Sequence, residues 1–426
     1  MRNLSASENQ SAGRLGINPI IIIGILFFIF GFVTWLNSTL IVFLKISCEL
    51  SYIPALLVAT AFYVSYFVMA MPSSRVLHKT GFKNGMALGL FIMALGSLVF
   101  VPAALTRTYW IFLIGLFIQA AGLTLLQTAA NPYVVIIGPR ESAARRISIM
   151  GICNKIAGVI SPIVLGFIVL KNADEISLSL KTITGNEKEL VLNSLAQRVI
   201  VPYVIMAIVL TGLSLLIRYV HLPEINTDND EVSSKPGGAK KTNLFQFPHL
   251  IIGFISLFCY VGAEVISIDT IIPYGQSLGF ALKTARIFAS YALASMVVGY
   301  ILGIIAMPRY ITQSNALTIS AALGIIFTIA AVNTSGYMSI AFLALLGSAN
   351  ALIWPTIWPL AIADLGKFVK TGSALLIMGI IGGATLPLVY GLLSEKWDSK
   401  QQAYWMLVPI YIFILYFSTS GHKIRK

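Results

Sequence analysis

"GLTLLQTAANPYVVIIGP", residues 122–139, ends a long apolar stretch of the chain, yet it carries two amide side chains and a proline. Gln127 and Asn131 are one helical turn apart, so they share a helix face, and Pro132 follows directly. A helix surrounded by lipid has no water to solvate such groups, so they must face protein or a cavity. The stretch predicts a membrane-embedded helix that turns its amide face inward, with Pro132 breaking the regular helix beside a cavity.

The whole chain has the composition of an integral membrane protein. Of its 426 residues, 57% are hydrophobic and 11% are charged, and the mean hydropathy is +0.86. Crossing a bilayer takes about 20 apolar residues in a helix, whereas barrel strands are shorter and alternate. We therefore expect an all-α bundle of twelve spans, near 19–44, 53–77, 84–104, 109–135, 146–170, 199–220, 248–275, 284–306, 314–332, 337–361, 370–394 and 402–419.

One long polar stretch, "PEINTDNDEVSSKPGGAKKTN", separates the sixth predicted helix from the seventh. Its Asp, Asn, Ser, Gly and Lys content is typical of a flexible linker. The expected organisation is a cytoplasmic tail over 1–18, a six-helix half over 19–220, a linker over 221–247, a second half over 248–419 and a basic tail over 420–426. The other long loop, 171–198, has room for a short surface helix.

The two halves resemble each other at an offset of about 224 residues. Pro132 then faces Pro355, and Pro162 faces Pro387. Such a repeat is typical of transporters whose six-helix halves are related by an axis along the membrane normal, with the substrate site between the halves near mid-membrane.

The positive charge indicates an orientation. Lysine and arginine are more numerous in the segments on the side of the two termini, which predicts that both termini are cytoplasmic in a plasma membrane. The net charge of +13 is spread over short loops, so contact with anionic lipid explains it better than a nucleic-acid partner. We expect the lipid bilayer and a small molecule as partners, and a monomer.

No residue pattern favours an enzyme, a metal site or a bound cofactor. Catalysis needs converging acids, bases, nucleophiles or metal ligands. The histidines lie in predicted loops or at helix ends without ligand spacing, and the cysteines are isolated: His78, His221, His249, His422, Cys48, Cys153 and Cys259.

Three ionisable residues fall inside predicted spans: Lys155 in the fifth helix, and Glu264 and Asp269 in the seventh. A charge at the bilayer centre costs about 2.5 to 3.5 kcal/mol on insertion scales, so each should face a cavity or a partner. Glu264 fits either an ion-coupling or sugar-binding carboxylate or a structural ion pair with Lys155. Asp269 fits either a functional site or the outer interface. Lys155 fits either a fixed positive charge that makes a coupling proton unnecessary or a side chain that extends to the membrane surface, although it lies far from either end of its helix.

Uncharged polar residues and aromatic residues form a second set. They lie on helices 1, 4, 5, 7 and 10, which are expected to line the central cavity. Amides both donate and accept hydrogen bonds, and an aromatic face packs against sugar C–H groups, so the set favours a neutral polyol or sugar. The candidate substrate-binding residues are Asn37, Ser38, Gln127, Asn131, Asn154, Tyr260, Asn350 and Trp354.

The opening stretch resembles the run G-L-x-x-L-x-T-A-A-N-P-[FY]-V-x-x-L/I-G-P of the fucose-galactose-glucose:proton symporter branch of the major facilitator superfamily. "PYVIMAIVL" at 202–210, "FCYVGAEV" at 258–265 and "IMGIIGGATLPLVYGLLS" at 377–394 extend the resemblance over almost the whole chain. It implies twelve helices in two halves, alternating access, and cation-coupled uptake of a hexose or deoxyhexose across a bacterial inner membrane.

The chain departs from this branch where proton coupling is expected. Acidic residues of proton-coupled members stand at the positions of Ser38 and Gln127, and both are absent here. Other members of the branch carry the glutamate of "YVGAE", which matches Glu264. The resemblance therefore implies that coupling to H⁺ or Na⁺ takes place through Glu264. The alternatives are an uncoupled uniporter or exporter of another small polar metabolite, and a membrane nutrient sensor without transport.

Overall fold

The structure is a computed structural model that describes residues 19–50, 52–171, 176, 179–180, 182–220, 222–223 and 243–424, and within these ranges it contains helices but no strand. The first half of the chain forms α1 (Pro19–Ser47), α2 (Tyr52–Thr106), α3 (Tyr109–Ile136), α4 (Ala143–Val169), α6 (Asn186–Gln197) and α7 (Ile200–Tyr219). The short helix α6 lies in the 171–198 segment, as the length of that segment allowed.

The second half is divided into shorter helices. It forms α8 (Pro248–Asp269), α9 (Ile271–Ser277), α10 (Leu282–Ala306), α11 (Gln313–Asn333), α12 (Gly336–Ala351), α13 (Ile353–Ala361), α14 (Val369–Met378), α15 (Gly382–Lys396), α16 (Lys400–Ala403) and α17 (Leu407–Thr419). The 3₁₀ turn η4 (Gly379–Ile381) joins α14 to α15, so these pieces form one span. In the same way, α12 continues into α13 and α16 into α17.

Twelve spans follow once α2 is counted as two. Eleven helical segments of the described chain are long and apolar enough to cross a membrane, and one of them, Thr60–Thr106, has 47 residues, about twice the length that a span requires. Gly81 lies inside it with φ 74° and ψ 176°, a conformation that favours glycine because it has no Cβ. The helix breaks there, between the predicted spans 53–77 and 84–104, and the predicted fold is confirmed.

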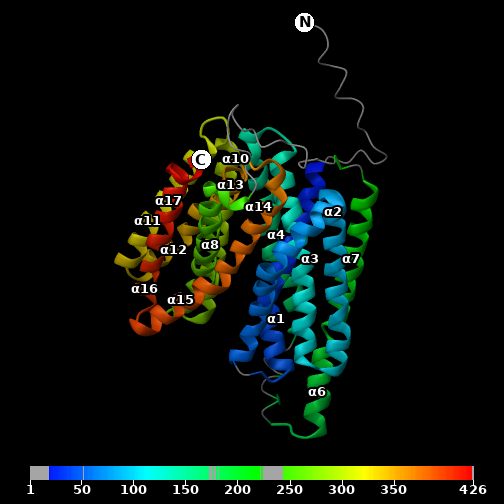
Figure 1. Cartoon of the computed structure of the whole chain (residues 1–426). Coiled ribbons are helices and arrows are strands. Elements are labelled where there is room, and N and C mark those ends of the chain that lie inside the picture. Colours follow the sequence, from blue (N-terminus) through cyan, green and yellow to red (C-terminus); the bar gives the residue numbers. More distant parts are fainter. Residues whose placement is uncertain are drawn as a thin grey trace.

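The two halves lie side by side (Figure 1): the helices from α1 to α7 form one bundle, and those from α8 to α17 form the other. Helices α2 and α3 of the first bundle contact α14 of the second, and α4 contacts α10 and α13. The substrate site expected between the halves is therefore bounded by helices from both.

One expectation about the opening stretch is wrong: Pro132 does not interrupt its helix, because α3 runs unbroken to Ile136. Proline removes one backbone donor, but membrane helices tolerate this where side chains bond the freed backbone groups. The oxygen that loses its donor is that of Thr128, four residues before Pro132, and α3 accommodates this single loss without ending. In the second half, the corresponding span is interrupted at Leu352, between α12 and α13 and just before Pro355.

Two glycine contacts fix the helices that carry the site. A Cβ on Gly31 of α1 would lie 2.0 Å from the carbonyl oxygen of Asn154 in α4, and one on Gly382 of α15 would lie 2.0 Å from that of Phe258 in α8. Both approaches exclude any larger residue. In each half, one glycine therefore lets two helices meet backbone to backbone, next to the predicted site residues on α4 and α8.

Candidate functional site

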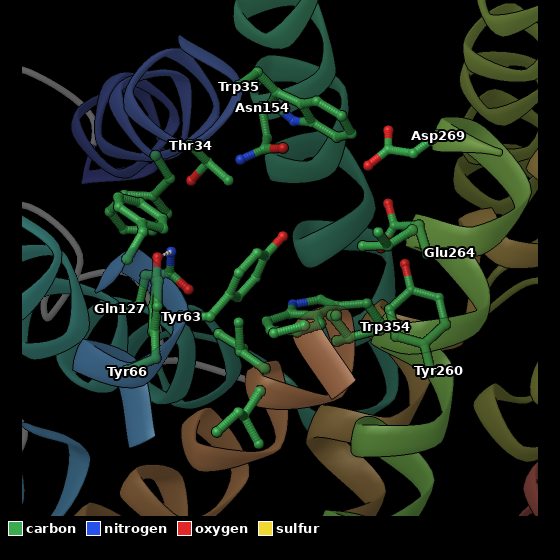
Figure 2. Close-up of a pocket in the computed structure, with 18 of the residues that line it drawn as sticks. Thr34, Trp35, Tyr63, Tyr66, Gln127, Asn154, Tyr260, Glu264, Asp269 and Trp354 are labelled. Atoms are coloured by element: carbon green, nitrogen blue, oxygen red, sulfur yellow. Dashed lines mark hydrogen bonds between the residues drawn. The ribbon is translucent and has the colours of Figure 1, made fainter. Parts of the chain in front are cut away.

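A cavity of about 600 Å³ lies between the halves (Figure 2). This is within the range of about 300 to 1,000 Å³ that is usual for small-molecule sites. Helices α1, α2, α3 and α4 line one side, and α8, α10, α13 and α15 line the other. The predicted site residues among the lining are Gln127, Asn131, Asn154, Lys155, Tyr260, Glu264, Asp269 and Trp354.

An ion pair crosses the cavity from one half to the other. Lys155 Nζ on α4 contacts Glu264 Oε1 on α8, and the two side chains are only 7% and 13% exposed. Lys155 Nζ also lies 5.0 Å from the centre of the Trp35 ring, so an aromatic face supports its charge. A pair this buried is stable only while both partners are present, because either charge alone would lack compensation.

Asp269 is the second carboxylate of the cavity. It is the last residue of α8, and its side chain is exposed to the cavity space, close to Glu264 in Figure 2. Within the described residues it forms no ion pair, although it lies within electrostatic range of both Glu264 and Lys155. No cluster of three His, Cys, Asp or Glu side chains that could hold a metal ion occurs in the described part of the chain.

The amide face of α3 points into the cavity, as the opening stretch predicts. Gln127 Nε2 donates to the Tyr66 hydroxyl oxygen at 2.9 Å, and Asn131 Nδ2 donates to the backbone at 2.9 Å. Asn131 Oδ1 is buried and accepts no hydrogen bond from any described residue. Buried polar atoms are nearly always paired, so this enclosed oxygen beside the cavity is an unusual unpaired acceptor.

The other uncharged residues predicted for the site supply one more amide and two aromatic faces to the lining. Asn154 Nδ2 donates to the Phe27 backbone oxygen at 3.3 Å. The Tyr260 and Trp354 ring centres are 6.3 Å apart. Figure 2 shows Gln127 on one side of the cavity, the carboxylates on the opposite side, and Trp354 between them.

Three predicted residues are not placed in the cavity wall. Asn350 is fully buried: its Nδ2 donates to the Ser267 hydroxyl at 3.1 Å and its Oδ1 accepts from the Tyr411 hydroxyl at 2.8 Å. It therefore joins α12 to α8 and α17 within one half. The side chains of Asn37 and Ser38 lie outside the described residues.

Sequence reasoning did not single out the other Trp and Tyr residues of the lining, which are Trp35, Tyr63, Tyr66 and Tyr300. For two of them, Tyr300 and Trp35, the sequence does hold a signal, because each packs against a glycine of α4. A Cβ on Gly151 would lie 2.7 Å from the Tyr300 ring, and one on Gly158 would lie 2.6 Å from the Trp35 ring. These glycines make room on α4 for an aromatic side chain from each half.

The halves also meet at the end of the bundle where α1 begins and α17 ends (Figure 1). There Ser74 Oγ donates to Thr371 Oγ1 at 3.2 Å, and Arg140 forms an ion pair with Asp364 at 3.2 Å. Gln313 Nε2 donates to the Glu141 backbone oxygen at 2.9 Å. We call this set of contacts the closed end.

The cavity extends away from the closed end. The lining residues on that side include exposed side chains of α2, α8 and α15, namely Thr60, Asp269 and Leu388. Contacts between the halves thus close one end of the bundle, while the cavity extends toward the opposite end. This is the geometry of one state of an alternating-access carrier.

The fold and this cavity define a multi-span membrane transporter. The family model of the Major Facilitator Superfamily matches residues 23–384, and the chain belongs to that superfamily. This confirms the resemblance and the fold class that the sequence predicts. The family's members are transporters, not enzymes.

Two curated relatives match nearly end to end. The glucose/galactose transporter of Brucella abortus biovar 1 (strain 9-941) is 31% identical over 402 residues, which cover 94% of this chain and 93% of the relative. The L-fucose-proton symporter of Escherichia coli (strain K12) is 29% identical over 425 residues, which cover 97% and 94%.

A solved structure shares the architecture. The crystal structure of FucP, a major facilitator transporter in the outward conformation, matches with a TM-score of 0.83 and 26% identity, covering 94% of this chain and 98% of that one.

Proposed function

We propose that this protein imports a hexose or deoxyhexose sugar by alternating access. The observation that carries the proposal is the cavity lining, which combines three amide side chains with aromatic faces between the two halves. Asn131 lines the cavity and carries an amide oxygen without a partner among the described residues, which a turn of its side chain would present to a sugar hydroxyl, while Trp354 offers a flat apolar surface to the ring. The names of the relatives, a glucose/galactose transporter and an L-fucose-proton symporter, support the same substrate class.

The proposed site consists of Gln127, Asn131 and Asn154 with Tyr260 and Trp354. Asn350 is left out of it, because both ends of its amide are already bonded within one half. The proposed arrangement in the membrane has both termini cytoplasmic in a bacterial inner membrane, halves over 19–220 and 248–419, and one chain as the working unit. The closed end is then cytoplasmic, and the cavity faces outward.

Uptake is proposed to be coupled to a cation, H⁺ or Na⁺. The sequence assigns this role to Glu264, and the geometry restricts how Glu264 can serve, because Lys155 already neutralises it. A cation that binds Glu264 has to displace an ammonium group that is bonded across the two halves. The same ion pair supports a second candidate function, an uncoupled uniporter with Lys155 as a permanent counter-ion.

Labelled-sugar uptake into proteoliposomes tests the substrate class. Saturable uptake of a hexose or deoxyhexose is expected, and Asn131→Ala should raise KM about tenfold, as expected when about 1.4 kcal/mol of binding is lost. Asn333→Ala is the matched control, because Asn333 is an exposed asparagine of α11 outside the cavity. The absence of saturable uptake for every hexose, pentose and amino sugar would reject the sugar assignment. Sugar binding without flux would indicate a sensor.

A further inference from the structure

The charges of the cavity do not balance. Among the described residues that line it, one side chain is cationic, Lys155, and two are anionic, Glu264 and Asp269. The cavity therefore carries one uncompensated negative charge. We propose that Asp269 binds one monovalent cation, H⁺ or Na⁺, and that this cation must be present before the cavity can close over the sugar. This inference rests on the proposed function and assigns the coupling site within it.

Geometry separates the roles of the two carboxylates. Glu264 contacts Lys155 Nζ directly and is 13% exposed. Asp269 forms no ion pair with any described residue, and its side chain is exposed in the cavity. A cation that arrives through the open side reaches Asp269 without breaking the Lys155–Glu264 pair.

The position of Asp269 in its helix strengthens its attraction for a cation. Asp269 is the final residue of α8, and the chain turns at Thr270 before α9 begins at Ile271. The C-terminal end of a helix carries a partial negative charge from its aligned peptide dipoles. This partial charge adds to that of the carboxylate, and interrupted helices in transporters use such ends to coordinate coupling ions.

Closure of the outer side makes the cation necessary. In the present state the Asp269 side chain is exposed on the cavity, so water can reach its carboxylate. In the opposite state of the carrier, the halves meet on this side and remove that water. A lone carboxylate without water or a partner is strongly unfavourable, and a neutral sugar brings no charge to offset it. Sugar and cation must then cross together, which couples uptake to the cation gradient.

If the cation is H⁺, the charge of Asp269 changes with pH, and few other groups near it could change charge in the same range. Its charged neighbours are Glu264 on α8 and Lys155 on α4. Tyr63 on α2 and Tyr300 on α10 also line the cavity. Tyrosine in water titrates near pH 10 and lysine slightly above, so between about pH 5 and 8 the change in charge falls on a carboxylate. Glu264 is already paired with Lys155, so Asp269 is the carboxylate of the cavity without a cationic partner among the described residues.

The first experiment measures sugar accumulation by the full chain in proteoliposomes under an imposed H⁺ or Na⁺ gradient. Asp269→Asn should lower the ratio of internal to external sugar to about one, and Asp269→Glu should restore accumulation, which shows that the loss is not a folding defect. Asp398→Asn is the matched control, since Asp398 is an exposed carboxylate outside the cavity. Accumulation by Asp269→Asn at the wild-type level would overturn the proposal.

The second experiment uses no sugar, so it separates this proposal from the sugar assignment. A jump in H⁺ or Na⁺ concentration across membrane-adsorbed proteoliposomes should produce a transient charge movement in the wild type. That movement should disappear in Asp269→Asn and persist in Asp398→Asn, and the jump that produces it identifies the cation. If no sugar is carried but Asp269→Asn abolishes the movement, the cation site stands and the sugar assignment fails. No movement in the wild type after either jump would overturn the site.

Discussion

The ion pair between Lys155 and Glu264 should behave as one energetic unit. Lys155→Gln leaves a carboxylate without its partner, and Glu264→Gln leaves an ammonium group without its own; the paired side chains are 7% and 13% exposed. Loss of one partner of a buried pair costs about 3 to 5 kcal/mol. Because both side chains face a cavity that water can enter, we expect about 3 kcal/mol for each single variant.

The double variant Lys155→Gln/Glu264→Gln should be more stable than either single variant. Two neutral amides can hydrogen-bond to each other and leave no buried charge, so we expect a total loss of about 1 to 2 kcal/mol and a coupling energy of a few kcal/mol. Lys155→Gln should cost more than Glu264→Gln by up to about 1 kcal/mol, because it also removes the contact of the ammonium group with the Trp35 ring.

Unfolding titrations of the four proteins in detergent measure these differences. Sugar-equilibration rates recorded on the same preparations show whether stability and transport change together. Additive losses, with the double variant less stable than either single variant, would refute the reasoning, because they would mean that the two charges are solvated independently in the folded state.

Three further outcomes are expected. Gly31→Ala places a Cβ 2.0 Å from the facing carbonyl oxygen of α4 and should destabilise by about 1 to 3 kcal/mol in a thermal melt, whereas Gly212→Ala, with nothing within 4 Å, should not. Asn350→Ala leaves two buried hydroxyl groups without their amide partner and should cost about 1 to 3 kcal/mol without changing the KM for sugar; a raised KM at unchanged stability would return it to the binding site. Asp364→Asn removes an exposed ion pair worth about 0 to 1 kcal/mol, so stability should hold while thiol labelling of a Ser74→Cys background increases; unchanged labelling would mean that this pair does not hold the closed end.

The fold could be predicted because membrane helices must be long, apolar and internally hydrogen-bonded. That constraint located the spans, including the break near Gly81 that separates two helices joined in α2. The effect of Pro132 could not be predicted in the same way. Whether a proline interrupts a membrane helix depends on how the surrounding protein accommodates the lost backbone donor, and α3 continues past Pro132 to Ile136.

The candidate site could be predicted only where a residue is unusual in lipid. Charges and amides inside spans are unusual, and Lys155, Glu264 and Asp269 all line the cavity. The aromatic residues of the lining gave no such signal, since Tyr66 or Tyr300 would equally suit a lipid-facing or packed position. Asn350 is the converse case, a residue that was predicted for the site but does not line it. In sequence, an amide that hydrogen-bonds to neighbouring helices cannot be told from one that faces a cavity.

The closed end also offers a means of trapping the protein in a single shape. Ser74 Oγ and Thr371 Oγ1 lie 3.2 Å apart on opposite halves, so the two side chains are in direct contact. The combined substitutions Ser74→Cys and Thr371→Cys, once oxidised to a disulfide, would link the two halves covalently at the closed end. The cavity would then stay open at the opposite end of the bundle. Ligand affinity could then be measured in a carrier unable to cycle, and reduction would release it. A binding protein raised against the stapled form would serve as a reversible inhibitor of exchange.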